Sequence, residues 1–184
     1  MKLFFILGNQ LFPTKYIDRF KKDHTFFMAE DSASLAKFLI TEDSSWVTGQ
    51  IIAVEAIQGY QESLKKNKGS IVLFSTVAAQ RGFANHAIIA STKAAVEGLT
   101  VSLAAEFAPS IRVNCIAPSL TNSKISNFLL KNEKVAEGIA KMHPMKRIGE
   151  GGDSASVAKF LLTEESSWIT GQIIGVDGGR SSVA

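Results

Sequence analysis

The sequence has little of several residue types that mark particular classes of protein. Its 184 residues include one cysteine and three histidines, which excludes a disulfide-stabilised scaffold and a cysteine-based zinc site, so we expect no metal site. No apolar run approaches the roughly eighteen residues of a membrane-spanning helix. The apolar start, Met1 to Leu7, ends at Gly8, which is too short for a secretory signal. We therefore expect a cytoplasmic protein with no membrane partner.

Charge and hydrophobicity are close to those of an average soluble protein. The chain is 46% hydrophobic and 20% charged, and its formal net charge is +3. Because the lysines are spread along the chain, this small positive charge does not indicate a nucleic-acid partner. The length suits one domain, or one domain with an appendage.

An internal repeat divides the chain. Residues 31–55 read DSASLAKFLITEDSSWVTGQIIAVE and residues 153–177 read DSASVAKFLLTEESSWITGQIIGVD, with 19 of 25 positions identical. Two copies do not make a solenoid, which needs three or more units in series. The repeat indicates one duplicated segment with other material between the copies.

The second copy has a readable local structure. Asp153 and Ser154 can cap a helix that runs to residue 162, and Gln172–Val176 is rich in branched residues, as in a strand. The Asp-Gly-Gly that follows predicts a tight turn. Each copy holds one tryptophan, Trp46 or Trp168, which we expect to pack rather than to form a stacking platform.

The rest of the chain alternates between strand and helix patterns. Strands are expected at residues 3–7, 24–28, 70–75 and 111–116, and helices at 15–22, 57–66, 84–107 and twice between 122 and 142. Continuously apolar strands separated by helices are typical of an α/β fold with a mainly parallel sheet flanked by helices.

Four motifs from residue 69 onward occur in a specific order. They are a strand G-S-I-V-L-F-S-T, the segment I-A-S-T-K-A-A-V-E-G-L, the strand R-V-N-C-I-A-P-S, and the terminal T-G-Q-I-I-G-V-D-G-G. Over about residues 57–180 this pattern resembles the C-terminal half of the short-chain dehydrogenase/reductase family. The resemblance implies a partial Rossmann-like three-layer fold. It also implies hydride transfer between NAD or NADP and a small-molecule carbonyl or alcohol.

The resemblance also implies roles for individual residues. Thr76 would hold the substrate oxygen, and Lys93 would bind the nicotinamide ribose. The family places a catalytic tyrosine four residues before this lysine. The lysine ammonium lowers the pKa of the tyrosine phenol, which then acts as the acid/base group. Ile89 stands at that position, and an isoleucine cannot transfer a proton. Cys115 lies within a strand, where we expect a buried small side chain rather than a nucleophile.

Two further groups of residues extend the implied site. Pro118 and Ser119 stand where the family has Pro-Gly beside the nicotinamide, and Thr121 and Ser123 follow, with hydroxyls suited to the carboxamide. His86 lies three residues before Ile89, and histidine is suited to proton transfer near neutral pH. His86 is therefore either a replacement catalytic group or a structural residue at the helix start.

The first part of the chain does not match the family. No T-G-x-x-x-G-x-G motif follows the first expected strand, although the family binds pyrophosphate with that loop. Residues 1–31 instead resemble the opening of photolyase-related proteins. We therefore divide the chain into an atypical segment, 1–56, and a dehydrogenase-like part, 57–184, packed as one domain.

Two classes of function remain open. The first is an NAD(P)-dependent oxidoreductase, impaired because the glycine loop and the tyrosine are absent. The second is a non-catalytic pseudoenzyme or assembly partner of an intact dehydrogenase, since the helices beside the Ser70 strand usually pack between subunits in this family. A homo-oligomer is expected in either case, and a rearranged gene product without a selected function is a third possibility.

Overall fold

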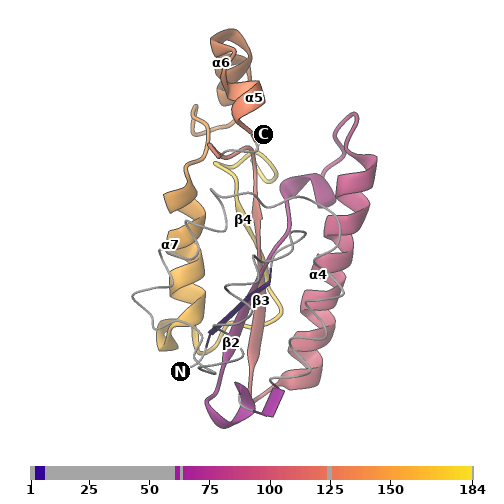
Figure 1. Ribbon diagram of the computed structural model, residues 1–184, viewed down its shortest axis with the longest axis vertical. Coiled ribbons are helices and arrows are strands. Elements are labelled where there is room, and N and C mark those ends of the chain that lie inside the picture. The colour runs from indigo at the N-terminus through magenta and orange to yellow at the C-terminus, as the bar shows by residue number, and fades with distance from the viewer. Residues whose placement is uncertain (1–2, 7–60, 63, 124–125, 184) are drawn as a thin grey trace, which may run out of the picture.

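The sheet contains four parallel strands. The computed structural model describes residues 3–6, 61–62, 64–123 and 126–183. In these ranges the strands β1 (Leu3–Ile6), β2 (Ser70–Phe74), β3 (Arg112–Pro118) and β4 (Ile173–Val176) lie side by side in that order. Every neighbouring pair is parallel. The expected α/β fold with a parallel sheet is confirmed (Figure 1).

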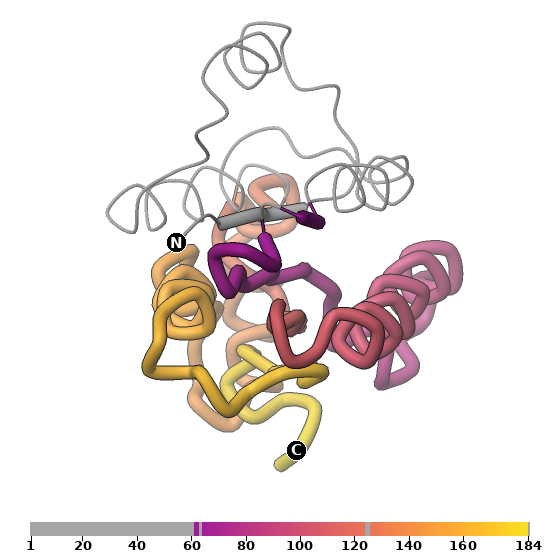
Figure 2. The backbone as a smooth tube through the Cα atoms, turned by 90° about the horizontal axis from the view of Figure 1, so that it is seen from below, coloured from indigo at the N-terminus to yellow at the C-terminus, as the bar shows by residue number. Residues whose placement is uncertain are grey.

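Helices cover both faces of this sheet. Helix α4 (Ala87–Phe107) lies on one face and α7 (Gly151–Leu162) on the other (Figure 2). The short helices α5 (Asn127–Leu130) and α6 (Glu133–Lys141) lie beyond the carboxyl ends of the strands. Two 3₁₀ turns, η1 (Val77–Ala79) and η2 (Glu164–Ser166), are also present, and residues 61–62 and 64–66 are helical, within the helix expected at 57–66. The result is the expected three-layer arrangement of helix, sheet and helix.

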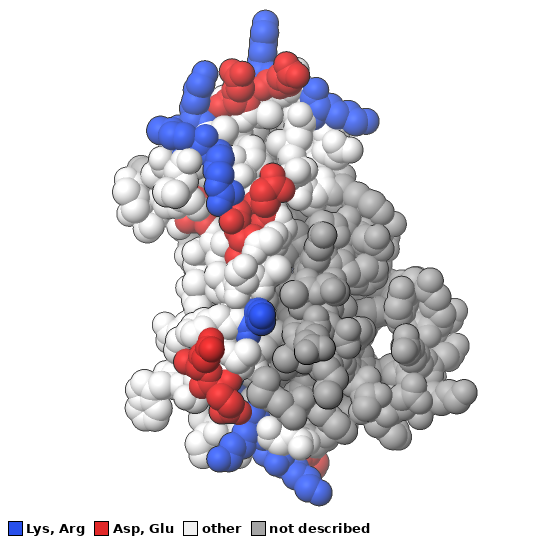
Figure 3. Space-filling model, turned by 90° about the vertical axis from the view of Figure 1, so that its left-hand side faces the viewer, with Lys and Arg blue, Asp and Glu red and all other residues white. Residues whose placement is uncertain are grey.

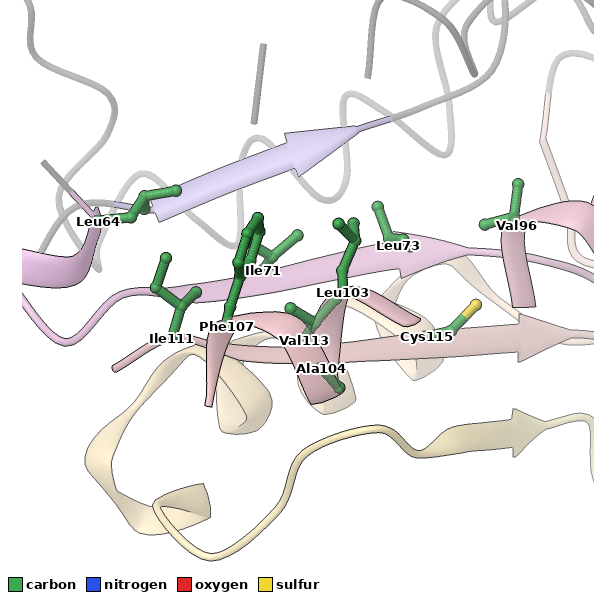
Figure 4. Packing of buried hydrophobic residues seen from close by; sticks show 10 residues of the cluster. All are labelled: Leu64, Ile71, Leu73, Val96, Leu103, Ala104, Phe107, Ile111, Val113 and Cys115. Atoms are coloured by element: carbon green, nitrogen blue, oxygen red, sulfur yellow. The ribbon is translucent and has the colours of Figure 1, made fainter. Parts of the chain in front are cut away.

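Strand β2 explains why the molecule has two cores. All five of its residues are buried, and successive side chains of a strand point to opposite faces. Ile71 and Leu73 pack with α4, as Figure 4 shows, whereas Val72 and Phe74 pack with α7. A strand covered on both faces requires the continuous apolar run that the sequence displays.

Helix α4 presents one stripe to the sheet. Its buried residues are Val96, Thr100, Leu103, Ala104 and Phe107, and this spacing places them along one side of a helix. By length and composition α4 also meets the criteria for a membrane-crossing helix, which the core helices of soluble proteins meet as well. In this structure its apolar stripe forms part of the core.

Two local expectations for the second repeat copy are wrong. Helix α7 begins at Gly151 rather than at Asp153, because the Asp153 carboxylate accepts a hydrogen bond from the Glu150 N–H at 2.7 Å and so stabilises an earlier start. Arg147 donates to the same carboxylate at 2.7 and 2.8 Å. Trp168 is 99% exposed, so it does not pack against the rest of the described structure as expected.

Several expectations lie outside the described residues. They concern the helix at 15–22, the strand at 24–28, the first repeat copy with Trp46, the photolyase-like segment beyond residue 6 and the boundary between 56 and 57. The second repeat copy supplies β4, which pairs with β3 at the end of the sheet. On the α7 side, the charged side chains of the described residues are of both signs and intermixed (Figure 3).

Candidate functional site

The carboxyl ends of β2 and β3 are joined by a side-chain contact from Thr76. This residue follows β2, and its Oγ1 donates to the carbonyl oxygen of Pro118, the last residue of β3, at 3.3 Å. The same oxygen accepts from the Ala78 N–H at 3.4 Å and so caps η1. Thr76 is half-buried. Its hydroxyl is therefore held at the strand end where the resemblance expects it.

Lys93 reaches the same edge of the sheet from α4. Its Nζ donates to the carbonyl oxygen of Phe74, the last residue of β2, at 3.0 Å. Burial lowers the pKa of the Lys93 ammonium, and the nearby Cys115 partly opposes that shift. A cation that is largely removed from water acts more strongly on neighbouring groups than one at the surface.

A polar network that the sequence analysis missed surrounds Lys93. Ser75 Oγ lies 2.6 Å from Glu97 Oε1, to which it donates, and 3.3 Å from the Lys93 carbonyl oxygen. Gln80 Nε2 donates to Glu97 Oε2 at 3.1 Å. The spacing of Lys93 and Glu97, one helical turn apart, was the available signal. This network ties α4 to the end of β2.

Ile89 and His86 lie one turn or more before Lys93. Ile89 is half-buried in the first turn of α4. His86 precedes the helix as its N-terminal cap residue and is exposed, with Nδ1 2.7 Å from the carbonyl oxygen of Ala84. Its ring also lies near Phe83, with 5.6 Å between centroids. The position agrees with a residue at a helix start, and its catalytic role stays a prediction.

Ser119 is paired with a buried histidine that the sequence analysis did not single out. Ser119 Oγ lies 2.8 Å from His143 Nε2, and His143 Nδ1 lies 2.8 Å from the carbonyl oxygen of Ile139. Because a carbonyl only accepts, Nδ1 donates to Ile139, and in this Nδ1–H tautomer Nε2 accepts from the Ser119 hydroxyl. His143 is 2% exposed. The pair fixes the Ser119 side chain at the carboxyl end of β3.

The other hydroxyls predicted for the cofactor pocket make local contacts. Thr121 Oγ1 donates to the Ser119 carbonyl oxygen at 3.0 Å. Ser123 Oγ lies 3.1 Å from Ser126 Oγ. A hydroxyl that donates one hydrogen bond still has lone pairs, so Thr121 retains the capacity to accept from an amide.

Cys115 is buried in β3, as expected. Burial raises the pKa of its thiol to about 12, although a hydrogen bond from the Thr100 side chain opposes the shift. At neutral pH this cysteine is a thiol, and a thiol is a poor nucleophile. The expectation of a small packing side chain is confirmed.

The turn after β4 closes the same edge of the sheet. Gly178 and Gly179 have φ values of +60° and +84°, which glycine adopts without strain. The Asp177 carboxylate accepts from the Gly179 N–H at 2.9 Å and from the Ser181 N–H at 2.8 Å. Burial works to raise the pKa of Asp177, but the hydrogen bond from the Ser181 hydroxyl, together with those from the two N–H groups, outweighs it, and the pKa is lowered.

The structure thus brings Thr76, Lys93, Pro118, Ser119 and Thr121 to the carboxyl edge of β2 and β3. In parallel α/β sheets this edge is where ligands bind. The arrangement offers three hydroxyls and one desolvated ammonium, which can position a polar oxygen and a sugar. The roles assigned to these residues stay predictions.

Comparisons with known proteins identify the family of this chain. Residues 55–181 match the family model described as enoyl-(acyl carrier protein) reductase. Tropinone reductase-like 3 of Erythroxylum coca is 34% identical over 140 residues, which cover 76% of this chain and 54% of that protein. The short-chain dehydrogenase/reductase SDRA of Arabidopsis thaliana is 42% identical over 118 residues, covering 62% and 46%.

A solved structure supports the same assignment. The structure titled ElxO with NADP bound is 31% identical, has a TM-score of 0.63, and covers 68% of this chain and 52% of its own. This chain spans about half the length of the curated relatives it matches. With the family model matched over more than half of its residues, the chain belongs to the short-chain dehydrogenase/reductase family.

Proposed function

We propose that this chain carries the catalytic edge of an NAD(P)-dependent oxidoreductase acting on a small carbonyl or alcohol, with impaired proton transfer. The observation that carries the proposal is that Thr76 Oγ1 binds the carbonyl oxygen at the end of β3 and Lys93 Nζ binds the one at the end of β2. Family membership supports hydride transfer as the reaction, and the NADP in the related ElxO structure supports the cofactor.

The described residues suit the nicotinamide end of such a cofactor. Lys93 would hold the ribose hydroxyls through its desolvated ammonium, and Thr121 would accept a hydrogen bond from the carboxamide. The nicotinamide supplies or accepts the hydride. Thr76 and Ser119 would accept a hydrogen bond from the hydroxyl of an alcohol substrate, because each donates its own hydrogen to a neighbouring group and retains a lone pair.

Ile89 is the basis for proposing impairment. The isoleucine stands one turn before Lys93, where the family has its acid/base tyrosine, and it has no proton to exchange. His86 is the proposed replacement, because it is exposed and lies at the start of the same helix. Turnover that is unchanged in His86→Ala across pH 5 to 8 would exclude that role.

The proposal is tested by substituting Lys93. NADP and NAD binding are measured by calorimetric titration, and turnover is followed as nicotinamide absorbance with a panel of ketones and secondary alcohols. Lys93→Met should reduce either signal by roughly a hundredfold or more. Lys159→Met, on the exposed side of α7, is the matched control and should change neither. Absence of both binding and turnover in the parent chain would contradict the proposal.

A second candidate is a non-catalytic assembly partner. The outward side of α4 exposes Ile88 at 77% and Val101 at 50%, together with small residues such as Ala94 and Ala95. Small side chains allow another helix to approach closely. Light scattering tests this candidate, because a strict monomer without a partner argues against packing through α4.

A further inference from the structure

Two loops meet above the carboxyl end of β3. Strand β3 lies between β2 and β4 in the sheet, and the loops that follow those two neighbours come together where Arg81 Nη1 donates to the carbonyl oxygen of Arg180. The second loop starts beside Ser119, whose N–H donates to Val176 at 3.4 Å. The two arginines therefore border the strand end that holds Ser119.

The guanidinium of Arg180 is held by weak partners. It lies over the Phe83 ring, 4.8 Å from the centroid, and Nη2 donates to Met142 Sδ at 3.5 Å. An aromatic face and a thioether fix the position of a cation without neutralising it. Among the described residues no carboxylate lies within 4.0 Å of Arg180. The side chain is half-buried, so water compensates its charge incompletely.

The charges that act on Arg180 within the described part of the chain favour a bound anion. Burial lowers the pKa of Arg180, the charge of Arg81 lowers it further, and Asp177 only partly opposes them. The Asp177 carboxylate is already bound by Gly179 and Ser181. Two nearby guanidinium groups repel each other, and an anion that binds between or beside them relieves that repulsion. Arginine is the side chain best shaped for carboxylate, with two parallel N–H donors.

We propose that the substrate is anionic: a small keto or hydroxy carboxylate whose carboxylate group binds Arg180 beside Arg81, above the end of β3. The proposal rests on the oxidoreductase function proposed for the same site. Ser119 lies beside the two arginines and belongs to the strand end to which the substrate oxygen and the nicotinamide are assigned. The anion bound there is therefore part of the substrate rather than a phosphate of the dinucleotide. The carbonyl or hydroxyl carbon of such a molecule would face Thr76 and Ser119.

Binding without turnover tests the proposal. The full chain is titrated with acetoacetate and with methyl acetoacetate, its uncharged ester, while ¹H–¹⁵N spectra are recorded. Acetoacetate should bind more tightly than the ester. Arg180→Gln should weaken acetoacetate binding by roughly ten- to a hundredfold, because a charged hydrogen-bond pair is lost, and should leave the ester unchanged. Lys159→Gln, with the same change in charge far from this loop, is the matched control.

A second variant distinguishes loss of the Arg180 guanidinium from loss of the folded structure. Arg180→Lys keeps the charge but not the planar fork, and it should bind acetoacetate with intermediate affinity. Equal binding of acid and ester to the parent chain, or equal acetoacetate binding to the parent and to Arg180→Gln, overturns the proposal. It is also overturned if Arg180→Gln weakens binding of NADP and not of acetoacetate. If the parent chain shows neither dinucleotide binding nor turnover but still binds acetoacetate more tightly than its ester, the oxidoreductase function is rejected and the anion site is not.

Discussion

Replacing Ile89 by tyrosine should restore an acid/base group beside Lys93. The two residues are four apart on α4, so their Cβ atoms lie about 5–6 Å apart on one side of the helix. A long helical side chain leans toward the preceding turn, which directs Lys93 toward position 89. The ammonium is desolvated, and it should therefore favour ionisation of a phenol placed there.

The expected magnitude follows from Coulomb's law. Two opposite charges about 5 Å apart, in an effective dielectric of about 20, attract by roughly 3 kcal/mol. An attraction of that size raises the acid dissociation constant of the phenol roughly a hundredfold. If a dinucleotide binds, a positioned acid/base group should also raise turnover by roughly a hundred- to ten-thousandfold.

The assay is a spectroscopic titration of tyrosinate. The parent chain has two tyrosines, and the spectrum of Ile89→Tyr minus that of the parent isolates the new phenol. Ile88→Tyr is the matched control, because position 88 is 77% exposed and faces water. The reasoning is wrong if the phenol at 89 ionises no more readily than the one at 88, or if adding Lys93→Met to Ile89→Tyr leaves its ionisation unchanged.

Two further predictions concern the stability of the fold. Leu161 on α7 is fully buried against the sheet, so Leu161→Ala should lower the free energy of unfolding by about 2–5 kcal/mol. The neighbouring Phe160 is 38% exposed, so Phe160→Ala should lower it by about 1 kcal/mol or less. Urea unfolding measures both variants. The Asp177 carboxylate, whose folded pKa is lowered, stabilises the fold above its unfolded pKa of about 4, and this contribution is lost as the pH falls through the lower folded value. Asp177→Asn should therefore lower the unfolding free energy at neutral pH and flatten its decline in acid. An unchanged acid limb in unfolding curves recorded from pH 7 to pH 2 would contradict that assignment.

Local patterns in the sequence predicted most of the described secondary structure. The strand expected at 70–75 is observed at Ser70–Phe74, because a continuous run of branched and apolar residues suits a strand covered on both faces. The long helix expected from residue 84 begins at Ala87 instead. Asn85 has a φ of +63°, a left-handed conformation that a right-handed helix does not continue through. Trp168 shows the limit of such patterns, since nothing in its neighbourhood along the chain separates an exposed tryptophan from a packed one.

Some residues of the candidate site could be named from the sequence, and others were found only in the structure. Thr76, Lys93 and the Pro118-Ser119 pair could be named from the sequence, because each stands in a motif that resembles the short-chain dehydrogenase/reductase family. His143 and Glu97 acquired their roles from contacts with Ser119 and Ser75. His143 follows Ser119 by 24 residues, and no local pattern indicates that the two side chains meet.

The sequence by itself determined the family, the parallel sheet and the missing tyrosine, because these follow from residue identity and short-range order. Only the tertiary structure decided that Arg81 and Arg180, separated by 99 residues, meet at the carboxyl end of β3. Strand order sets which loops become neighbours. That order depends on packing across the whole sheet, where Ile71 and Val113 share one core and distant segments are brought within a few ångströms.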